Sequence, residues 1–405
     1  MSTRGVGPKF GRAGVVIVAS MWIPSHVVRQ PSLPTYTRVV QLEPTADTSA
    51  NVSIGDVNGD GKLDLVLIKG RHWPGMSRVL LGDGKGHFAR AHDLSDTRYR
   101  SYSGNLVDID GDGAPDVILS NDAPDPKVIL INDGHGQFRL SGAFGQGSWP
   151  TRNVAVADVN GDGRPDIIVA NRGDHATQYV CLNQGRGRFD ASCAVVADYS
   201  ATTITPADIN HDGRVDLVIP HRDGGQSYVY LNGGSAGFSS ERRMPFGPAT
   251  ASVRMAAVAD LDGDGAPDII VIDDERRAVE AYYGNRAGGF DAARPFDTGK
   301  AVPYALTIAD LNRDGHPDVV VGFVEAPSAA FFGNGKSRQF ARVTFGDSVG
   351  AVYGFAVADL DGDGHLDIAA ARSEAPNMLY FGDDGRPARG RSGQVLRRVS
   401  SRKSF

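Results

Sequence analysis

A nine-residue acidic pattern recurs along the chain and has the residue types and spacing of a metal-binding loop. The pattern Asp-x-[Asn/Asp]-x-Asp-Gly-x-x-Asp begins at seven positions, which are Asp56, Asp108, Asp158, Asp208, Asp260, Asp310 and Asp359. Ca²⁺ takes six to eight oxygen ligands in a flexible shell, and carboxylates at positions 1, 3, 5 and 9 of a tight loop can converge on one point. The glycine at position 6 permits a sharp turn that brings the carbonyl of position 7 inward. The pattern therefore predicts a calcium ion in each loop, up to seven in all.

Five predicted ligands come from each loop, four side chains and the main-chain carbonyl of position 7. In chain order they are Asp56, Asn58, Asp60, Lys62 and Asp64; Asp108, Asp110, Asp112, Ala114 and Asp116; Asp158, Asn160, Asp162, Arg164 and Asp166; Asp208, Asn210, Asp212, Arg214 and Asp216; Asp260, Asp262, Asp264, Ala266 and Asp268; Asp310, Asn312, Asp314, His316 and Asp318; Asp359, Asp361, Asp363, His365 and Asp367. Simple turns would explain one or two of these acids per loop. Three or four acids held together seven times would repel one another without a cation. We expect weaker binding in the four loops with Asn at position 3, because ligand charge tunes calcium affinity.

The segments that must position these loops also repeat. A short alternating apolar run precedes each loop, as in residues 154–157, and a β-branched run follows it, as in residues 167–169. Most copies then show an apolar pair and a glycine-rich turn closed by Phe, as at Phe88, Phe138 and Phe189. Such runs, bounded by Gly, Asn and Asp, are typical of short strands joined by tight turns. Four strands every 49 to 52 residues predict an all-β fold, a seven-bladed β-propeller of four-stranded antiparallel blades.

The ends of the repeat array predict how the propeller closes. Residues 36–42 resemble the fourth strand of a repeat, yet no first three strands precede them, and the last repeat lacks a recognisable fourth strand. We expect the N-terminal strand to complete the seventh blade and close the ring. The alternative is that residues 394–399 supply that strand. The predicted domains are a signal peptide and leader (1–34), the propeller (35–385) and a basic, disordered tail (386–405).

The acidic loops and the recurrent turns closed by Phe resemble FG-GAP/VCBS repeats, which build the N-terminal propeller of integrin α-subunits and occur in many secreted bacterial proteins. The resemblance covers about residues 36–385. It implies a seven-bladed propeller with Ca²⁺ in the loops between the first two strands of each blade. His211 and Arg313 depart from the usual glycine at position 4, away from the ligand positions. Integrin legs and a transmembrane helix are absent, so integrin signalling is not implied.

The face opposite the acidic loops carries the side chains expected to bind a partner. Six residues before each loop, at the predicted mouth of the central channel, lie Ala50, Tyr102, Arg152, Thr202, Arg254, Tyr304 and Tyr353. The candidate ligand-binding residues are Lys69, His72, Trp73, Tyr102, Arg152, Arg172, His221, Arg222, Arg254, Tyr304, Tyr353 and Arg372. This aromatic and cationic set suits an acidic or hydroxyl-rich ligand. Ordinary solvated loop polarity is the alternative explanation.

Two classes of function fit this face. The first is a non-catalytic binding or adhesion module for a glycan or a protein, with no catalytic residues. The second is a carbohydrate-active enzyme of the polysaccharide lyase type, in which Tyr and His act as acid and base and Arg neutralises a uronate. Propellers host both classes, so the fold does not decide between them. Because no nucleophile triad, zinc motif or phosphate loop is visible, the sequence favours binding.

Composition bounds the partners and the compartment. The 405 residues carry a net charge of −6, which argues against nucleic acid as a partner, but seven bound Ca²⁺ would turn it into +8 and leave an acidic glycan as a candidate. Three basic residues precede an apolar run at 13–23 that is too short to span a membrane, a pattern typical of a secretory signal. We expect a secreted, periplasmic or cell-surface monomer with no transmembrane segment in the mature chain. The two cysteines, Cys181 and Cys193, flank one hairpin, and the sequence leaves open whether they pair.

Overall fold

The computed structural model describes residues 33–384 apart from 191, 286–287 and 298. The predicted leader, except for residues 33 and 34, and the basic tail lie outside this part of the chain, as does the alternative closing strand at 394–399. The described residues are all-β, and the one helical element among them is a short 3-10 helix, η1 (Ser240–Arg242). No helix among the described residues is long and apolar enough to cross a membrane.

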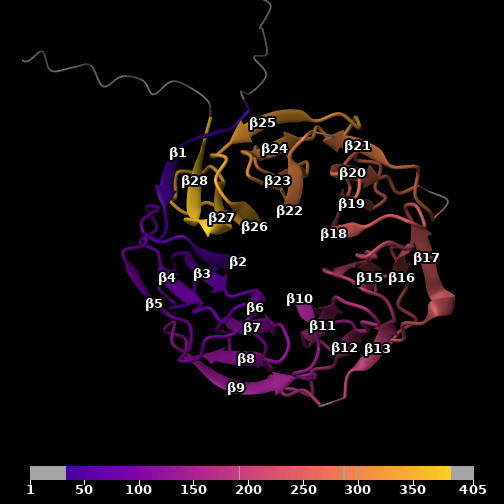
Figure 1. Cartoon of the computed structure of the whole chain (residues 1–405), viewed down its shortest axis with the longest axis horizontal. Helices are drawn as coiled ribbons and strands as arrows, with labels where there is room; N and C mark the ends of the chain where they lie inside the picture. The colour runs from indigo at the N-terminus through magenta and orange to yellow at the C-terminus, as the bar shows by residue number, and fades with distance from the viewer. Residues whose placement is uncertain (1–32, 191, 286–287, 298, 385–405) are drawn as a thin grey trace, which may run out of the picture. The chain divides into compact units, whose positions relative to one another are not determined.

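Each repeat folds into strands in the expected order, and the first strand of each runs into an acidic loop. The first strands that Figure 1 labels lie nearer its middle than the other strands of their sheets. In chain order, the first strands are β2 (Asp47–Gly55), β6 (Ser101–Val107), β10 (Thr151–Ala157), β14 (Thr205–Ala207), β18 (Val253–Ala259), β22 (Val302–Ala309) and β26 (Ala351–Ala358). Each contacts the next along the chain, and β26 contacts β2.

The second and third strands follow each acidic loop and are mostly buried. The second strands are β3 (Asp64–Lys69), β7 (Asp116–Asn121), β11 (Asp166–Asn171), β15 (Asp216–Ile219), β19 (Asp268–Asp273), β23 (Asp318–Val324) and β27 (Asp367–Ala375). The third strands are β4 (Arg78–Leu81), β8 (Lys127–Asn132), β12 (Gln178–Cys181), β16 (Ser227–Tyr230), β20 (Ala278–Tyr282), β24 (Ser328–Phe332) and β28 (Met378–Asp383). The β-branched runs seen in the sequence form the second strands, since Val, Ile and Leu on both faces suit a strand covered on both sides.

The fourth strands lie at the outer edge (Figure 1), and where their burial is described most of their residues are exposed or half-buried. They are β5 (Arg90–Asp93), β9 (Phe138–Phe144), β13 (Ala194–Ala197), β17 (Arg243–Phe246), β21 (Arg294–Asp297) and β25 (Ala341–Phe345). The last repeat has no fourth strand of its own among the described residues. Its place is taken by the first strand of the chain, β1 (Thr35–Gln41), which pairs antiparallel with β28 from Thr35 opposite Asp383 to Gln41 opposite Met378. The pairing expected for the N-terminal strand is therefore present.

The strands pair antiparallel in sequence order within each unit. Four units are separate four-stranded sheets, formed by β6–β9, β10–β13, β14–β17 and β18–β21. The strands β2–β5, β22–β25 and β26–β28 with β1 belong to one twelve-stranded sheet, because β2 also pairs with β27 and β23 with β26. The register of β10 and β11 places Ala157 opposite Asp166, so the acidic loop between these two strands is the connection of a hairpin.

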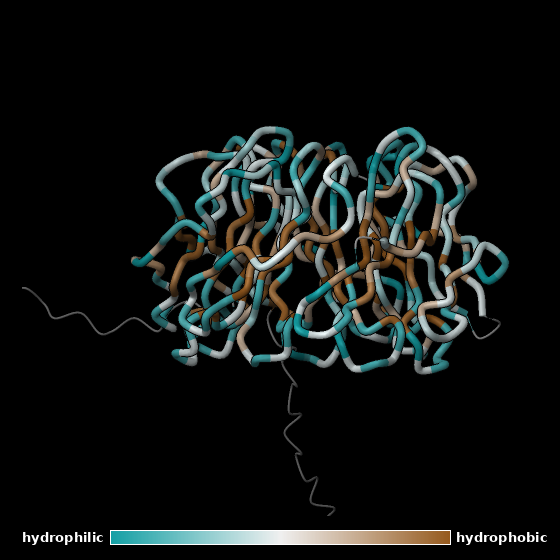
Figure 2. The backbone as a smooth tube through the Cα atoms, turned by 90° about the horizontal axis from the view of Figure 1, so that it is seen from below, coloured by the Kyte–Doolittle hydropathy of each residue, from teal (hydrophilic) through white to brown (hydrophobic). Residues whose placement is uncertain are grey.

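The hydrophobic core lies between neighbouring sheets. Ile118 and Ile129 of one sheet pack against Ile167 and Val169 of the next, and all four are almost fully buried. The same packing joins the two ends of the array, where Leu65 and its neighbours contact Ala369, Ala371 and Leu379. Figure 2 shows the hydrophobic residues as a band between two hydrophilic sets of loops. Each first strand runs toward an acidic loop at one end, and the residue six positions before that loop lies toward the other end.

Candidate functional site

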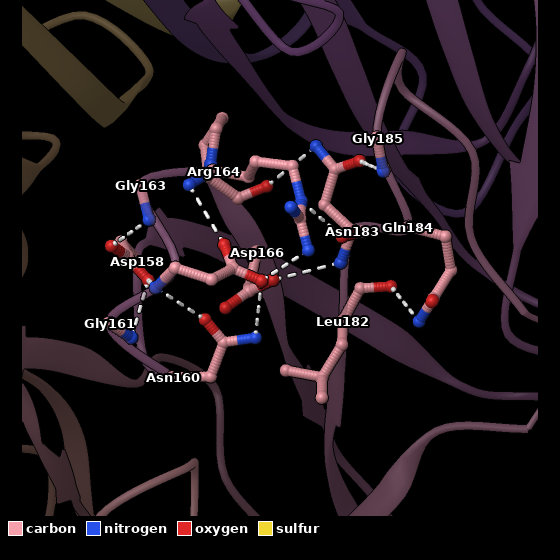
Figure 3. A network of polar contacts seen from close by, with 12 residues as sticks. Asp158, Asn160, Gly161, Gly163, Arg164, Asp166, Leu182, Asn183, Gln184 and Gly185 are labelled. Atoms are coloured by element: carbon pink, nitrogen blue, oxygen red, sulfur yellow. Dashed lines mark hydrogen bonds and ion pairs between the residues drawn. The ribbon is translucent and has the colours of Figure 1, made fainter.

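The acidic loops are built around the aspartate at position 1, which organises the turn through main-chain amides. In the third loop, Asp158 Oδ1 accepts hydrogen bonds from the amides of Gly161 (2.8 Å) and Asp162 (3.1 Å), and its Oδ2 accepts one from Gly163 (2.8 Å) (Figure 3). The other loops repeat the contact from the position 6 glycine to the position 1 carboxylate. This turn sets the backbone path that gathers the acids.

Position 4 of each loop takes a left-handed backbone conformation. Gly161 has φ of 76°, and the two residues that depart from glycine in this position, His211 and Arg313, have φ of 57° and 55°. Residues other than glycine adopt this region at a cost, because Cβ approaches the backbone. The fourth and sixth loops therefore keep the shape of the others despite the larger residue.

The aspartate at position 9 is buried and ties each loop to the turn between the third and fourth strands. Asp166 Oδ2 accepts a hydrogen bond from the amide of Val159 (3.1 Å). Its Oδ1 accepts one from the amide of Asn183 (2.8 Å), which Figure 3 shows. Burial raises the pKa of the position 9 aspartates, to about 7 for Asp268 and Asp318, although these amides oppose the shift. A buried carboxylate beside other acids is stabilised in its ionised form by a nearby cation.

Three loops bring carboxylates close enough to share one ion. In the second, fifth and seventh loops, the aspartates at positions 1, 3 and 9 each place one oxygen within 4.8 Å of the others: Asp108, Asp110 and Asp116; Asp260, Asp262 and Asp268; Asp359, Asp361 and Asp367. Oxygens bound to one Ca²⁺ at about 2.3–2.6 Å lie within about 5 Å of each other, so the residues present fit this ion. These are the loops with Asp at position 3.

Basic side chains already neutralise several of the loop acids. Arg164 and Arg214 at position 7 pair with the position 5 aspartates of their own loops. Arg338 reaches the fifth loop from the next repeat, with its Nε 2.9 Å from Asp262 Oδ2, and Arg38 of β1 pairs with Asp361 of the seventh loop. A metal ion in these loops would compete with the guanidinium groups for the same oxygens.

At the other end of the first strands, one cavity of about 190 Å³ collects the residues that lie six positions before the loops. All seven line it, together with residues of the loops that follow the second strands. Of the twelve candidate ligand-binding residues, those that line this cavity are His72, Tyr102, Arg152, Arg172, Arg254, Tyr304 and Tyr353. The structure therefore gathers seven of the twelve at one place.

The other five candidates lie elsewhere. Lys69 is buried, with its Nζ 2.8 Å from Glu43 Oε1 and 2.8 Å from Asp47 Oδ2. Arg372 is buried and pairs with Asp347 at 2.5 Å. Arg222 is buried against Asp274, and His221 stacks on Tyr199 with ring centroids 4.7 Å apart. Trp73 is 72% exposed and is not among the lining residues. The first three make internal ion pairs that hold the loops in place.

Three arginine–tyrosine pairs line the cavity. The guanidinium carbon of Arg152 lies 4.5 Å from the ring centroid of Tyr102, and that of Arg254 lies 3.6 Å from Tyr304. The third pair joins Arg71 to Tyr353 at 3.9 Å. Sequence analysis missed Arg71, which lies in a loop at φ of 63° and also donates to Ser373 Oγ at 3.0 Å. Arg71 directly precedes His72 and Trp73, two candidate ligand-binding residues, and this position in the sequence could have indicated it.

Acidic partners hold two of these arginines without covering the cavity. Arg254 makes two hydrogen bonds of 2.8 Å to the carboxylate of Asp274, and Arg152 lies 2.5 Å from Asp122. Because each guanidinium has five donors, such pairing orients the group and leaves other N–H groups for a ligand. The cavity therefore presents oriented cations beside aromatic rings.

Tyrosine and histidine side chains of the cavity are in contact with one another. The His72 Nε2 lies 2.8 Å from the Tyr102 hydroxyl, and the Tyr304 and Tyr353 rings lie 4.5 Å apart. Burial would raise the pKa of the Tyr304 phenol, but the charge of Arg254 and a hydrogen bond from Tyr353 outweigh it and lower the pKa. Burial also lowers the pKa of His72, so its neutral form is favoured. The cavity therefore brings phenol and imidazole groups together beside the arginines.

Comparison with known proteins supports the fold. No curated protein sequence matches the chain. Its structure is similar to that of an Agrocybe aegerita lectin that recognises non-reducing terminal N-acetylglucosamine, with a TM-score of 0.52, 21% identity and coverage of 82% of this chain and 87% of the lectin. It is also similar to BBS1N in complex with ARL6DN, with a TM-score of 0.58, 13% identity and coverage of 86% of this chain and 97% of that chain. A third similar structure is the V. cholerae biofilm matrix protein Bap1, with a TM-score of 0.50, 13% identity and coverage of 88% of this chain and 92% of that chain. At these identities the likeness concerns the fold alone.

The sequence profile of the FG-GAP-like repeat matches five overlapping stretches, which are residues 56–119, 108–169, 158–219, 208–271 and 260–321. Each stretch begins at the first aspartate of an acidic loop and ends in or beside the second strand of the next repeat. Together they span more than half of the chain. The chain therefore belongs to the FG-GAP-like repeat family.

Proposed function

We propose that this protein is a secreted, non-catalytic binding module, a seven-bladed propeller that holds an acidic glycan in its arginine–tyrosine cavity. The observation that carries the proposal is the set of three arginine–tyrosine pairs around one cavity, formed by Arg71, Arg152 and Arg254 with their tyrosines. Aromatic rings suit the apolar faces of sugars, and arginines suit carboxylates and sulfates. A lectin and a protein bound to a protein partner among the similar structures are compatible with a binding role.

The propeller itself is part of the proposal. The contact of β26 with β2, the core between the last and first sheets, and the pairing of β1 with β28 support seven blades closed by the N-terminal strand. Closure would remove exposed sheet edges at the junction and leave a monomer stable alone. The cavity would then lie at one end of the central channel.

Calcium is proposed to occupy the opposite end of each blade. Positions 1, 3, 5 and 9 and the carbonyl of position 7 would supply hard oxygen ligands, and the ion would neutralise acids that otherwise repel each other. Its role is to stabilise the loops, while the cavity residues bind the ligand. Titration with calcium should raise the thermal unfolding temperature, and chelation should reverse the rise. An unchanged melting curve would contradict the proposed role.

The disulfide between Cys181 and Cys193 supports an oxidising compartment. It joins the third strand of the third sheet to the segment before β13, which answers the question that the sequence left open. Extracellular calcium is abundant enough for modules of modest affinity. Both features favour secretion or display at the cell surface.

A glycan-binding assay tests the proposal directly. The calcium-loaded protein is applied to immobilised uronic-acid and sulfated oligosaccharides and to their neutral counterparts. Binding should be stronger to the charged series, and the Arg152→Gln/Arg254→Gln double variant should lose it. A Trp73→Ala variant serves as a control, because Trp73 is exposed and does not line the cavity. Equal binding to neutral and charged glycans, or binding that survives the double variant, would refute the proposal.

Elimination at a uronic acid is the second candidate function. It is favoured by the lowered pKa of Tyr304 and by the contact between His72 and Tyr102 in the same cavity. A base would remove the proton next to the carboxylate, an acid would protonate the departing glycosidic oxygen, and a carbon–carbon double bond would form. Incubation with uronic-acid polymers followed by ultraviolet detection of the unsaturated product tests this. Product that a Tyr304→Phe variant abolishes would replace the binding-only role.

A further inference from the structure

One sector of the cavity differs from the rest. The first strand of the fourth sheet, β14, has only three residues, whereas the other first strands have seven to nine. Its strand pairing begins at Thr205, so Thr202 and Thr203 precede it while still lining the cavity. At the first sheet Ala50 is also small, but Arg71 lies in that sector and reaches Tyr353. The fourth sheet is thus the place where the arginine–tyrosine lining is interrupted.

Two hydroxyl groups in this sector have no partner. The Oγ1 atoms of Thr202 and Thr203 are both buried, and no described residue makes a hydrogen bond with either. Two other threonine hydroxyls on the first strands are paired: Thr151 Oγ1 donates to Asn171 Oδ1 at 2.8 Å, and Thr205 Oγ1 donates to the Ala256 carbonyl at 2.7 Å. A buried polar group without a hydrogen-bond partner destabilises the folded protein. Both threonines line the cavity.

Positive charge flanks these hydroxyls on both sides. Arg152 belongs to the preceding first strand and Arg254 to the following one, and both line the cavity. Arg172 lines it as well and lies 3.1 Å from Asp223. Arg222 donates to Ser252 Oγ at 2.9 Å and pairs with Asp274. Four arginines thus face three aspartates here, since Asp122 pairs with Arg152, and one positive charge is left over.

We propose that Thr202, Thr203, Arg152 and Arg254 form a subsite, the threonine subsite, for the anionic group of the bound sugar. The inference rests on the proposed glycan-binding function and identifies the part of the cavity that distinguishes charged from neutral sugars. An oxyanion, a carboxylate or a sulfate, accepts hydrogen bonds from the two hydroxyls and from the flanking guanidinium groups. The three arginine–tyrosine pairs contact the sugar rings. A neutral sugar lacks an acceptor of this charge, so the subsite sets specificity for acidic glycans.

Calorimetric titration of variants tests the assignment. The probes are tetragalacturonate and its carboxyl-reduced counterpart, with calcium present. The Thr202→Val/Thr203→Val double variant keeps the side-chain shape and removes both donors. Its affinity for tetragalacturonate should fall by about tenfold or more, because hydrogen bonds to charged groups are stronger than those between neutral groups. Its affinity for the reduced probe should stay unchanged. Equal losses for both probes, or no loss, would overturn the proposal.

A matched control separates binding from folding. Thr205→Val removes a hydroxyl at the start of β14, directly after this segment. The Thr205 hydroxyl donates to the main chain of Ala256, and Thr205 does not line the cavity. We expect this variant to lower the unfolding temperature and to leave both affinities unchanged. A loss of tetragalacturonate affinity in this control equal to that of the double variant would also overturn the assignment.

A small oxyanion tests the subsite independently of any glycan. Crystals of the wild-type protein soaked in selenate should show an anomalous peak within hydrogen-bond distance of the two threonine hydroxyls, and the double variant should not. If no glycan binds but selenate lies there, the proposed function fails while the subsite stands. Selenate absent from this sector would refute the subsite. A sulfated galactan tetrasaccharide compared with tetragalacturonate then distinguishes sulfate from carboxylate as the natural anion.

Discussion

At the scale of single residues, ion pairs tune the acidic loops differently. Arg338 contacts Asp262 of the fifth loop and also lies 2.9 Å from Asp291, and its guanidinium lies 4.1 Å from the Tyr283 ring centroid. A fixed positive charge beside a ligand oxygen opposes the binding of a divalent cation. Of the three loops with Asp at position 3, which charge alone predicts to bind most tightly, the fifth and the seventh therefore carry an arginine from outside their own repeat, Arg338 and Arg38.

We predict that Arg338→Gln increases the calcium affinity of the fifth loop. The gain should be about fivefold, or about 1 kcal/mol, the size of a partly exposed ion pair. Calorimetric titration of the wild type, Arg338→Gln and the charge-retaining Arg338→Lys measures it. The difference should vanish in an Asp262→Asn background. Unchanged affinity in Arg338→Gln would show that the arginine does not compete with the ion.

A buried lysine gives the stability of the second sheet a dependence on pH. Lys127 Nζ donates to three main-chain carbonyls, those of Asp125 (3.2 Å), Gly147 (3.0 Å) and Trp149 (2.7 Å). Burial lowers its pKa from 10.5 to about 8, with Asp122 and Asp125 opposing the shift. Between these values the folded protein releases a proton that the unfolded chain keeps, so the free energy of unfolding rises with pH.

The expected result is that the wild type gains stability relative to Lys127→Met between about pH 8 and pH 10.5. The relative gain is at most about 3 kcal/mol, and below this window the cost of the buried charge is fully present. Urea unfolding of both proteins across this range measures it, and the comparison cancels the titration of other groups. A relative stability that stays constant or falls with pH would contradict the assigned pKa.

At the scale of strands and loops, asparagine side chains join successive sheets. Asn183 at the turn after β12 donates from Nδ2 to the carbonyl of Ile109 in the preceding sheet (2.9 Å) and to that of Pro165 (3.1 Å). Its Oδ1 accepts from Gly185 (2.9 Å) (Figure 3). Asn132 and Asn232 make the equivalent contacts with Val57 and Val159. The acidic loop of one sheet is thus tied to the turn of the next.

Asn183→Ala should lower the free energy of unfolding by about 2 kcal/mol, because it leaves two buried carbonyls without donors. Gln184→Ala is the matched control, since Gln184 is exposed and its amide makes only a 3.5 Å contact with Leu182. We expect the control to stay within about 0.5 kcal/mol of the wild type. Urea denaturation measures both. Similar losses in the two variants would show that the contact between sheets is not the cause.

At the scale of the whole array, the first strand and the two residues after it connect the two ends of the repeats. β1 pairs with β28, and the amide of Leu42 donates to the carbonyl of Asn377 at 2.9 Å. Glu43 is buried and accepts from Lys69 Nζ of the first repeat and from Asn377 Nδ2 of the last, both at 2.8 Å. Lys69, which sequence analysis placed at the ligand face, belongs to this junction.

Deletion of residues 35–43 should therefore lower the melting temperature and broaden the unfolding transition, because both ends lose their shared strand and the Glu43 pairs. Glu43→Gln serves as the milder variant. It keeps the strand and should reduce stability while unfolding stays a single transition. Differential scanning calorimetry distinguishes these outcomes. A truncated chain that melts like the wild type would show that β1 does not hold the ends together.

Local repetition in the sequence determined the loops, the strand order and the family. Each acidic loop is a hairpin connection whose turn needs only its own glycine and aspartates, so nine residues suffice to predict it. The residues six positions before the loops were also found from spacing, because a strand of regular length places them at its far end. Repeats thus expose both ends of every first strand.

Tertiary structure alone decided which charged residues line the cavity and which form buried ion pairs within the protein. From the sequence, we expected three cations to be exposed at the ligand face: Lys69, Arg222 and Arg372. In the structure each is buried and pairs with an acid from another part of the chain, as Arg372 does with Asp347. Arg71 and the unpaired hydroxyl of Thr203 joined the site for the converse reason. The disulfide was equally undecided, since pairing depends on the distance between two strands. Sequence spacing determines contacts within a repeat, whereas packing between sheets determines the partners of long side chains.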